Sequence, residues 1–269
     1  MQLRGASADA LFTLQGELEA RLQDGADAVR VGGDLFQVTQ LLRGEAGLRR
    51  IATDASVEAS AKQELVRQLL NGKVDPVVID LVSSAVGRRW TAPRDLADAI
   101  ERLSEISTVR SAGDNASQLS DELFEVQQIV AQNSELRDAL ANDNRSTADK
   151  ATLVRSLLEG KALPATVTLV QQSLSSTYRT VGAALTSYQK VAAEAADKSA
   201  ATVRVAHPLS DADRQRLTEV LSRQYSRSIH LNVIVDPSVV GGLSVELGDE
   251  VIDGTIAGRL DDARRKLAG

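Results

Sequence analysis

The 269-residue sequence contains no cysteine and very few aromatic residues. Without cysteine the chain can form no disulfide, which fits a reducing compartment such as the cytosol. One Trp, three Tyr and three Phe leave the core to aliphatic side chains. Proline occurs only five times, so long helices are possible, since proline interrupts a helix interior. We therefore expect a mainly α-helical protein with an aliphatic core.

Long apolar runs and an excess of positive charge are also missing. No stretch approaches the roughly 18 apolar residues of a membrane-spanning helix, and Asp9 and Glu17 interrupt any secretory-type apolar core near the N-terminus. The net charge is −6, whereas nucleic-acid binding needs a concentrated basic surface. Nucleic acid is therefore not expected as a partner, and membrane association is expected only indirectly, through other proteins.

Catalytic and cofactor-binding motifs are absent from the sequence. The only histidines, His207 and His230, fit neither a metal-ligand spacing nor a Ser-His-Asp order. The pair Gly241-Gly242 is not part of a phosphate loop. Asp249 and Asp253 could be proposed as paired carboxylates, but turn and helix-capping roles are favoured for them. We expect no enzyme activity, no catalytic residue, no metal site and no cofactor.

An internal repeat occupies the first two-thirds of the chain. At an offset of 88 residues, segment 34–90 aligns without gaps with segment 122–178, and 17 of the 57 pairs are identical. The densest match joins 62–73 to 150–161. Self-similarity at a fixed offset indicates repeated structural units. Two antiparallel helical bundles are therefore predicted, at 1–110 and 111–198.

Helical periodicity and capping residues support this division. Helices are expected at 34–43 and 122–131, and again at 56–70 and 146–158. Gly72 and Gly160 follow the second pair, where a left-handed residue would end a helix. Pro76 and Pro164 then suit the first turn of the next helix. Segment 93–109 lies 87 residues after the N-terminal helix 6–22, close to the repeat offset, so it is a candidate for a helix shared by both bundles.

The remaining segment, 199–269, has the period-two alternation of β-strands. Strands are expected at 201–206, 230–235 and 243–247. Ser210, with Asp213 three residues later, begins a helix after the first strand. The turn residues between the second and third strands predict a hairpin, and 256–267 has helical spacing. The predicted fold is thus two duplicated helical bundles followed by a small α+β module of order β-α-β-β-α.

A group of turn residues and charges in this module resembles a known family signature. Its members are Asp236, Pro237, Gly241, Gly242, Gly248, Asp249, Asp253 and Arg259. This pattern is similar to the C-terminal signature of the delta subunit of F-type ATP synthase, the oligomycin-sensitivity-conferring protein family. The pair Leu136-Arg137 before a Lys-x-x-Leu-x-x-x-Leu-Leu helix resembles the family's helical domain. Most members have one such domain, and the duplication is similar to that of actinobacterial members.

The resemblance implies a non-catalytic stator subunit of the peripheral stalk. Such a subunit links the catalytic head to the b subunits, so that proton-driven rotation is coupled to ATP synthesis. It implies a location at the cytoplasmic face of the cell membrane, as a peripheral part of the F1Fo complex. The alternative function is a helical-repeat adaptor between proteins, unrelated to ATP synthase.

Two partner contacts follow from the resemblance. The helical domain would hold the N-terminal helices of the alpha subunit in a groove between its first helix and a later one. In the first bundle this suggests the apolar residues Leu11, Leu14 and Leu18, facing Ile79, Val82 and Val86. The alternative for these six residues is a place in the core. The C-terminal module would hold the C-terminal end of the b subunits, through the sheet edge and the helix 256–267.

Overall fold

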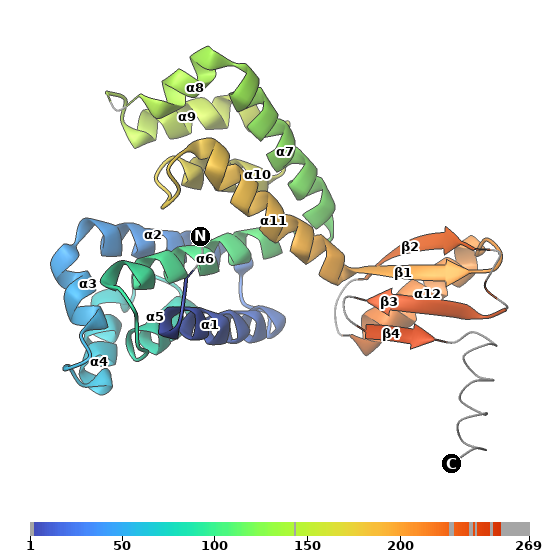
Figure 1. The fold of residues 1–269 in the computed structure, drawn as a ribbon, viewed down its shortest axis with the longest axis horizontal. Coiled ribbons are helices and arrows are strands. Elements are labelled where there is room, and N and C mark those ends of the chain that lie inside the picture. The colour runs from blue at the N-terminus through green and yellow to red at the C-terminus, as the bar shows by residue number, and fades with distance from the viewer. Residues whose placement is uncertain are drawn as a thin grey trace. The chain divides into compact units, whose positions relative to one another are not determined.

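The computed structural model describes residues 3–142, 144–225, 229–236, 239, 241–247 and 250–253. Within these residues the chain forms twelve α-helices and four β-strands (Figure 1). The mainly α-helical prediction is therefore confirmed. The chain divides into two compact units, one made of 1–112 and 118–192 and the other of 113–117 and 193–269.

The helical part repeats its secondary structure at the offset found in the sequence. Each helix from α7 to α11 begins 88 residues after its counterpart from α2 to α6. The helix α6 therefore ends the first repeat and takes the place of α1 in the second. We call α1–α6 repeat one and α6–α11 repeat two. The helices are α1 Ala6–Gln23, α2 Ala28–Gly44, α3 Ala46–Thr53, α4 Ala59–Leu70, α5 Pro76–Val86, α6 Pro93–Arg110, α7 Ala116–Gln132, α8 Ser134–Ala141, α9 Thr147–Leu158, α10 Pro164–Ser173 and α11 Val181–Ser199.

The predicted helix ends are partly confirmed. Gly72 and Gly160 have φ values of 70° and 74°, and Pro76 and Pro164 begin α5 and α10. The short helices α3 and α8 were not predicted, because eight residues give only about two turns of periodicity. The start of α2 was placed six residues too late.

The start of α2 is set by a capping residue. The side chain of Asp27 accepts hydrogen bonds from the backbone N–H groups of Val29 and Arg30, at 3.0 and 3.1 Å. Such a cap satisfies N–H groups that have no partner inside the helix. The pair Gly32-Gly33 follows within the next turn and hides the helical pattern, because glycine normally disfavours a helix interior.

Gly32 has a packing role where α2 meets α6. A Cβ atom at this position would lie 2.7 Å from the hydroxyl oxygen of Thr108 and 3.1 Å from its backbone nitrogen. Two hydroxyl groups of α6 donate to α2 carbonyls, from Ser104 to Gly32 at 2.7 Å and from Ser107 to Ala28 at 2.9 Å. The small residues thus let the two backbones approach closely.

In each repeat, a carboxylate on the second helix (α2 or α7) binds the turn before the fifth helix (α5 or α10). In repeat one, Asp34 accepts a hydrogen bond from the backbone N–H of Asp75, at 2.7 Å. In repeat two, Glu122 accepts one from the backbone N–H of Leu163, at 2.9 Å. Both pairs are related by the 88-residue offset, so the duplication preserves this interaction although the carboxylate side chain differs in length.

The loop between α10 and α11 docks on α2 and α6 through polar groups. Arg43 and Gln40 each donate to the backbone oxygen of Ser175, at 3.0 Å. Glu101, which is fully buried, accepts the N–H of Thr177 at 3.0 and 3.2 Å and forms an ion pair with Arg43. We call this contact the loop junction. It holds repeat two to repeat one.

A second carboxylate of α6 lies beside the loop junction. Glu105 is 1% exposed, pairs with Arg102 at 2.9 Å and accepts a hydrogen bond from the hydroxyl of Tyr178 at 3.0 Å. Burial raises the pKa of Glu105 from 4.5 to about 7, although Arg102 and the Tyr178 hydroxyl act in the opposite direction. Burial also raises the pKa of Glu101.

The C-terminal module is a four-stranded sheet with a helix on one face. Its elements are β1 Ala200–Val205, α12 Asp211–Gln224, β2 His230–Val235, β3 Leu243–Leu247 and β4 Glu250–Asp253. The strand order is β2-β1-β3-β4, with β1 parallel to β2 and all other pairs antiparallel. Leu221 of α12 packs with Val203 and Val245 of the sheet. As predicted, the side chain of Ser210 caps α12, accepting the N–H of Asp213 at 3.1 Å.

Two predictions for this module were wrong. The strands β2 and β3 do not form a hairpin, because β1 lies between them and pairs with both. The segment 236–242 therefore has to span two inter-strand spacings, about 10 Å, which a tight turn cannot do. The strand β4 was not predicted, and it forms the actual hairpin with β3. The predicted helix 256–267 lies outside the described residues.

The close approach of α2 and α6 predicts different effects for two adjacent glycines. Gly32→Leu should destabilise the protein by about 1–3 kcal/mol through overpacking. Gly33→Leu is the matched control, since a Cβ atom there meets nothing within 4 Å, and it should be neutral or stabilising. Urea unfolding followed by circular dichroism measures both. Equal effects of the two changes would contradict the close approach.

The burial of Glu105 predicts a pH-dependent stability. Because the folded protein binds this proton more tightly than the unfolded chain, its contribution is full below about pH 4.5 and is lost as pH rises towards about 7. Glu105→Gln removes the ionisation. Relative to the wild type, its free energy of unfolding should therefore rise over this window by up to about 3 kcal/mol. Urea unfolding at several pH values measures the difference, and exposed Glu125→Gln should show no such trend.

Candidate partner-binding surfaces

The six apolar residues predicted for the alpha-subunit groove lie together in repeat one. Leu14, Leu18, Val82 and Val86 belong to its core and are at most 3% exposed. Leu11 and Ile79 pack against this core and are partly exposed. In the free chain, therefore, only Leu11 and Ile79 of the six could meet a partner without movement of α1 or α5.

Ion pairs connect α1 and α5 above these core residues. Arg21 pairs with Asp80 at 3.1 Å, and Arg88 pairs with Glu17 at 2.6 Å. The hydroxyl of Ser84 also donates to Glu17, at 3.1 Å. These residues were not predicted, although the four-residue spacings Glu17–Arg21 on α1 and Asp80–Ser84 on α5 are a signal for a common face; Arg88 follows α5. Half-exposed pairs of this kind add little stability and can exchange partners when another chain binds.

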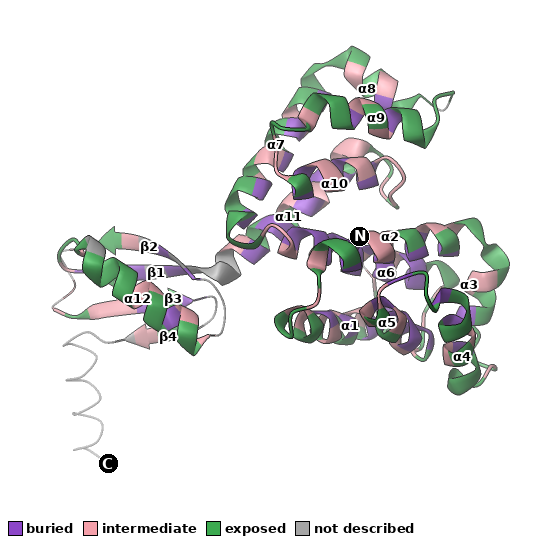
Figure 2. Ribbon diagram, turned by 180° about the vertical axis from the view of Figure 1, so that it is seen from behind, coloured by how far each residue is buried: buried purple, intermediate pink, exposed green. Residues whose placement is uncertain are grey.

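One large side chain on α1 is strongly exposed. Phe12 has 79% of its surface exposed, next to the partly buried Leu11. Figure 2 shows exposed and buried positions alternating along α1. The ring of Phe12 is therefore available to a partner without any movement of α1.

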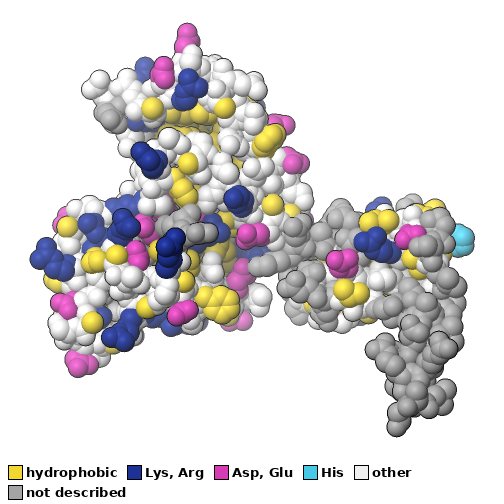
Figure 3. Space-filling view, viewed as in Figure 1, with side chains coloured by type: hydrophobic (Ala, Val, Ile, Leu, Met, Phe, Trp, Pro, Cys, Tyr) yellow, Lys and Arg dark blue, Asp and Glu magenta, His cyan; other side chains and the backbone are white. Residues whose placement is uncertain are grey.

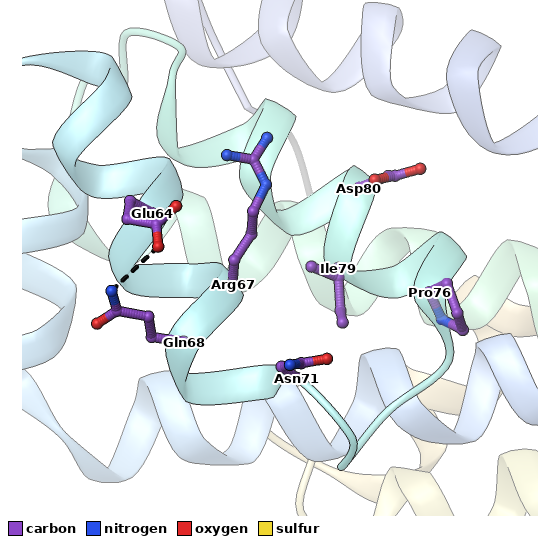
Figure 4. Close-up of a pocket in the computed structure, with 7 residues that line it drawn as sticks. All are labelled: Glu64, Arg67, Gln68, Asn71, Pro76, Ile79 and Asp80. Carbon is purple, nitrogen blue, oxygen red and sulfur yellow. Dashed lines mark hydrogen bonds between the residues drawn. The ribbon is translucent and has the colours of Figure 1, made fainter.

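A shallow cleft of about 370 Å³ lies between α4 and α5. Figure 4 shows Glu64, Arg67, Gln68 and Asn71 on the α4 side, and Pro76, Ile79 and Asp80 on the α5 side. The amide of Gln68 donates to Glu64 at 3.0 Å. Asp80 lines the cleft and also pairs with Arg21 of α1, so the cleft and the α1 surface form one continuous candidate site.

Among the described residues, no element covers the second face of the sheet in the C-terminal module, and we call it the open face. The helix α12 and the buried residues occupy the other face. On the open face, Ile234 of the edge strand β2 is 41% exposed and Val251 of the edge strand β4 is 63% exposed. In register, Ile234 neighbours Arg204 and Val251 neighbours Glu246. This face combines apolar and charged groups, as protein contact surfaces do.

The structure describes only part of the C-terminal signature. Gly241 and Gly242 have φ values of 64° and 79°, a left-handed backbone that glycine adopts readily. The N–H of Asp236 donates to the backbone oxygen of Val205 at 2.8 Å, where the chain leaves β2. Asp253 ends β4 and is in register with Ser244. Pro237, Gly248, Asp249 and Arg259 lie outside the described residues.

The described residues offer neither a metal site nor a membrane-spanning helix. No cluster of three or more His, Asp or Glu side chains there could hold a metal ion. In the same part of the chain, no helix is both long enough and apolar enough to cross a bilayer.

Comparisons with known proteins match the whole chain. The family model for the ATP synthase delta (OSCP) subunit matches residues 97–267. Proteins named ATP synthase subunit delta are similar over nearly their full length. The relative from Nocardioides sp. is 52% identical over 268 residues, with 99% of this chain and 98% of the relative covered. The relative from Kineococcus radiotolerans is 44% identical, with 98% of both chains covered, and that from Streptomyces griseus is 41% identical, with 99% and 100% covered.

These matches confirm the resemblance seen in the sequence and argue against an adaptor unrelated to ATP synthase. The chain belongs to the ATP synthase delta (OSCP) subunit family and is a non-catalytic component of the stator stalk of F1Fo ATP synthase, the complex that couples proton transport to ATP synthesis.

Proposed function

We propose that this chain links the catalytic head to the stalk through two separate surfaces. The surface of α1 and α5 binds the N-terminal helices of the alpha subunit. The C-terminal module binds the C-terminal end of the b subunits. The chain then acts from the cytoplasmic face of the cell membrane, as a peripheral part of the complex, and keeps the head from turning with the rotor.

We assign the alpha contact to repeat one because its first helix, α1, is more exposed than the first helix of repeat two. The family match begins at residue 97, within α6, so the usual helical domain of the family corresponds to repeat two. The first helix of repeat two is α6, however, and twelve of its eighteen residues are buried. It packs against α1, α2, α3 and α5 as well as α10. Only four of the eighteen residues of α1 are buried, which favours the α1 surface for a partner helix.

An amphipathic helix suits this surface chemically. Phe12, Leu11 and Ile79 offer apolar area, while the half-exposed pairs Arg21–Asp80 and Arg88–Glu17 border it. A partner helix with one apolar face and charged flanks would match both features.

The open face of the C-terminal sheet supports the second contact. Its exposed apolar residues, Ile234 and Val251, lie on the two edge strands, whose outer backbone groups have no sheet neighbour among the described strands. Edge strands of this kind accept a further chain readily. A b-subunit segment bound there would cover both apolar side chains.

The alpha contact can be tested with surface variants that leave the core intact. Leu14 is unsuitable, because an Asp in this fully buried position would unfold repeat one. Phe12→Glu combined with Ile79→Glu should instead lower the affinity for a synthetic peptide of the alpha-subunit N-terminus by at least roughly tenfold, since charges would replace apolar contacts. Isothermal titration with the full chain measures the affinity.

Phe124→Glu is the matched control for this experiment, because Phe124 is an exposed aromatic residue of repeat two. It should leave peptide binding unchanged. If Phe124→Glu weakens binding while the double variant does not, the alpha contact belongs to repeat two.

The stator role itself can be tested in the assembled complex. Ile234→Glu combined with Val251→Glu should weaken the hold on the b subunits, because it places charges in an apolar contact. Membrane vesicles carrying this variant should keep ATP hydrolysis but lose proton-driven ATP synthesis. Val220→Glu, at an exposed position of α12, is the control. Full coupling in the double variant would contradict the proposed contact.

A further inference from the structure

Repeat two contains a hollow of about 670 Å³ that no family feature explains. It is lined by α7, α8, α9 and the segment from the end of α10 to the start of α11. Six of its sixteen lining residues have aliphatic side chains, among them Val130, Leu140 and Leu174. Figure 3 shows hydrophobic side chains exposed below α8 and α9, with Lys or Arg side chains close by.

The charged lining of this hollow is mainly positive. Arg137, Lys150 and Arg179 line it, against a single acidic residue, Asp138. The first turn of α11 also borders it at Val181 and Gly182, and helix N-termini favour anions. In a chain with a net charge of −6, this concentration of positive charge is unusual.

Lys150 is the least expected member of this group. It is only 9% exposed, and within the described residues it makes no hydrogen bond or ion pair. Its counterpart in repeat one, Lys62, is equally buried but donates to the backbone oxygen of Asp54 at 3.1 Å. Its counterpart Lys150 lines the hollow, and the Nζ atom of Lys150 is not fully enclosed, since lysine can bury its aliphatic stem while the ammonium group stays accessible. The ammonium group is therefore available to an acceptor that another molecule supplies.

The equivalent cleft of repeat one is bordered by the loop junction. Positions 131, 137 and 182 of the hollow in repeat two correspond to Arg43, Arg49 and Arg94, which line a cleft of about 400 Å³ together with Thr177. Thr177 and Ser175 belong to the loop junction, where the chain forms turns and bends. Repeat one thus uses this place to bind a peptide segment, the α10–α11 loop. The described residues contain no third helical repeat whose loop could bind to repeat two in the same way.

The two hollows differ in charge. In repeat one, Glu101 and Asp98 receive the N–H and hydroxyl of Thr177, and Arg43 neutralises them. At the offset of 88 these three residues become Gln189, Thr186 and Ala131. Both carboxylates are lost, whereas the cations Arg137 and Lys150 are kept and Arg179 is added. The hollow of repeat two is therefore suited to a segment that brings its own carboxylates.

We propose that the hollow of repeat two binds an acidic segment of a partner chain within the ATP synthase complex. A carboxylate of that segment pairs with Lys150 and with Arg179 or Arg137. The neighbouring apolar side chains of the segment contact the aliphatic residues of the hollow. The volume is that of a site for several side chains, larger than a free inorganic anion needs. The inference rests on the proposed function only in placing the partner within the assembled complex.

Photo-crosslinking in the purified complex identifies the occupant. Benzoylphenylalanine replaces Ala131, which lines the hollow, and mass spectrometry locates the crosslinked residues. The expected product is a crosslink to a segment of another subunit that carries Asp or Glu within a few residues. A complex that assembles without such a crosslink, or a captured segment without a carboxylate, overturns the inference. Failure of the chain to assemble at all would instead count against the proposed function.

A synthetic peptide of the captured segment then tests the role of Lys150. Its affinity for the full chain should fall by roughly tenfold in Lys150→Met, the loss expected for one charge-assisted hydrogen bond. Arg179→Gln provides a second, exposed variant should Lys150→Met fail to fold. Arg155→Met, on an exposed position of α9 outside the hollow, is the control. Equal affinity of Lys150→Met, Arg179→Gln and the control would also overturn the inference.

Discussion

The helical part of this protein depends on the packing of α6. This helix ends repeat one, begins repeat two and is buried on most of its surface. Gly32 and the hydroxyl groups of Ser104 and Ser107 bring α2 against it at backbone distance. One turn before Ser104, Glu101 holds the loop between α10 and α11. Because α6 carries both contacts, the arrangement of either repeat depends on the same eighteen residues.

The sequence predicted the repeat and most helix ends because these follow from local rules. The left-handed glycines Gly72 and Gly160 and the prolines that begin α5 and α10 all act within a few residues. The order of the sheet did not follow in the same way. The strands β2 and β3 are neighbours in sequence, yet β1 lies between them. That pairing depends on the crossover through α12 rather than on the turn residues after β2.

The candidate site was harder to predict for a similar reason. Apolar spacing identifies the face that a helix buries, so it selected Leu14, Leu18, Val82 and Val86, which form the core. A contact surface consists of what remains outside, such as Phe12 and the ion pairs that connect α1 with α5. Only the comparison of the repeats within the fold shows that Lys62 has a hydrogen-bond partner, whereas Lys150 has none among the described residues. The sequence contains both lysines at matching positions but not their surroundings.

The shared helix also limits how such a protein can be shortened. A break after residue 110 would leave repeat two without its first helix and expose the side of α10 that α6 covers. A break before Pro93 would keep α6 with repeat two and yield a complete bundle of six helices. The family model begins its match at residue 97, inside α6. Gain or loss of one repeat in this family would thus proceed in units of five helices, although each finished bundle contains six.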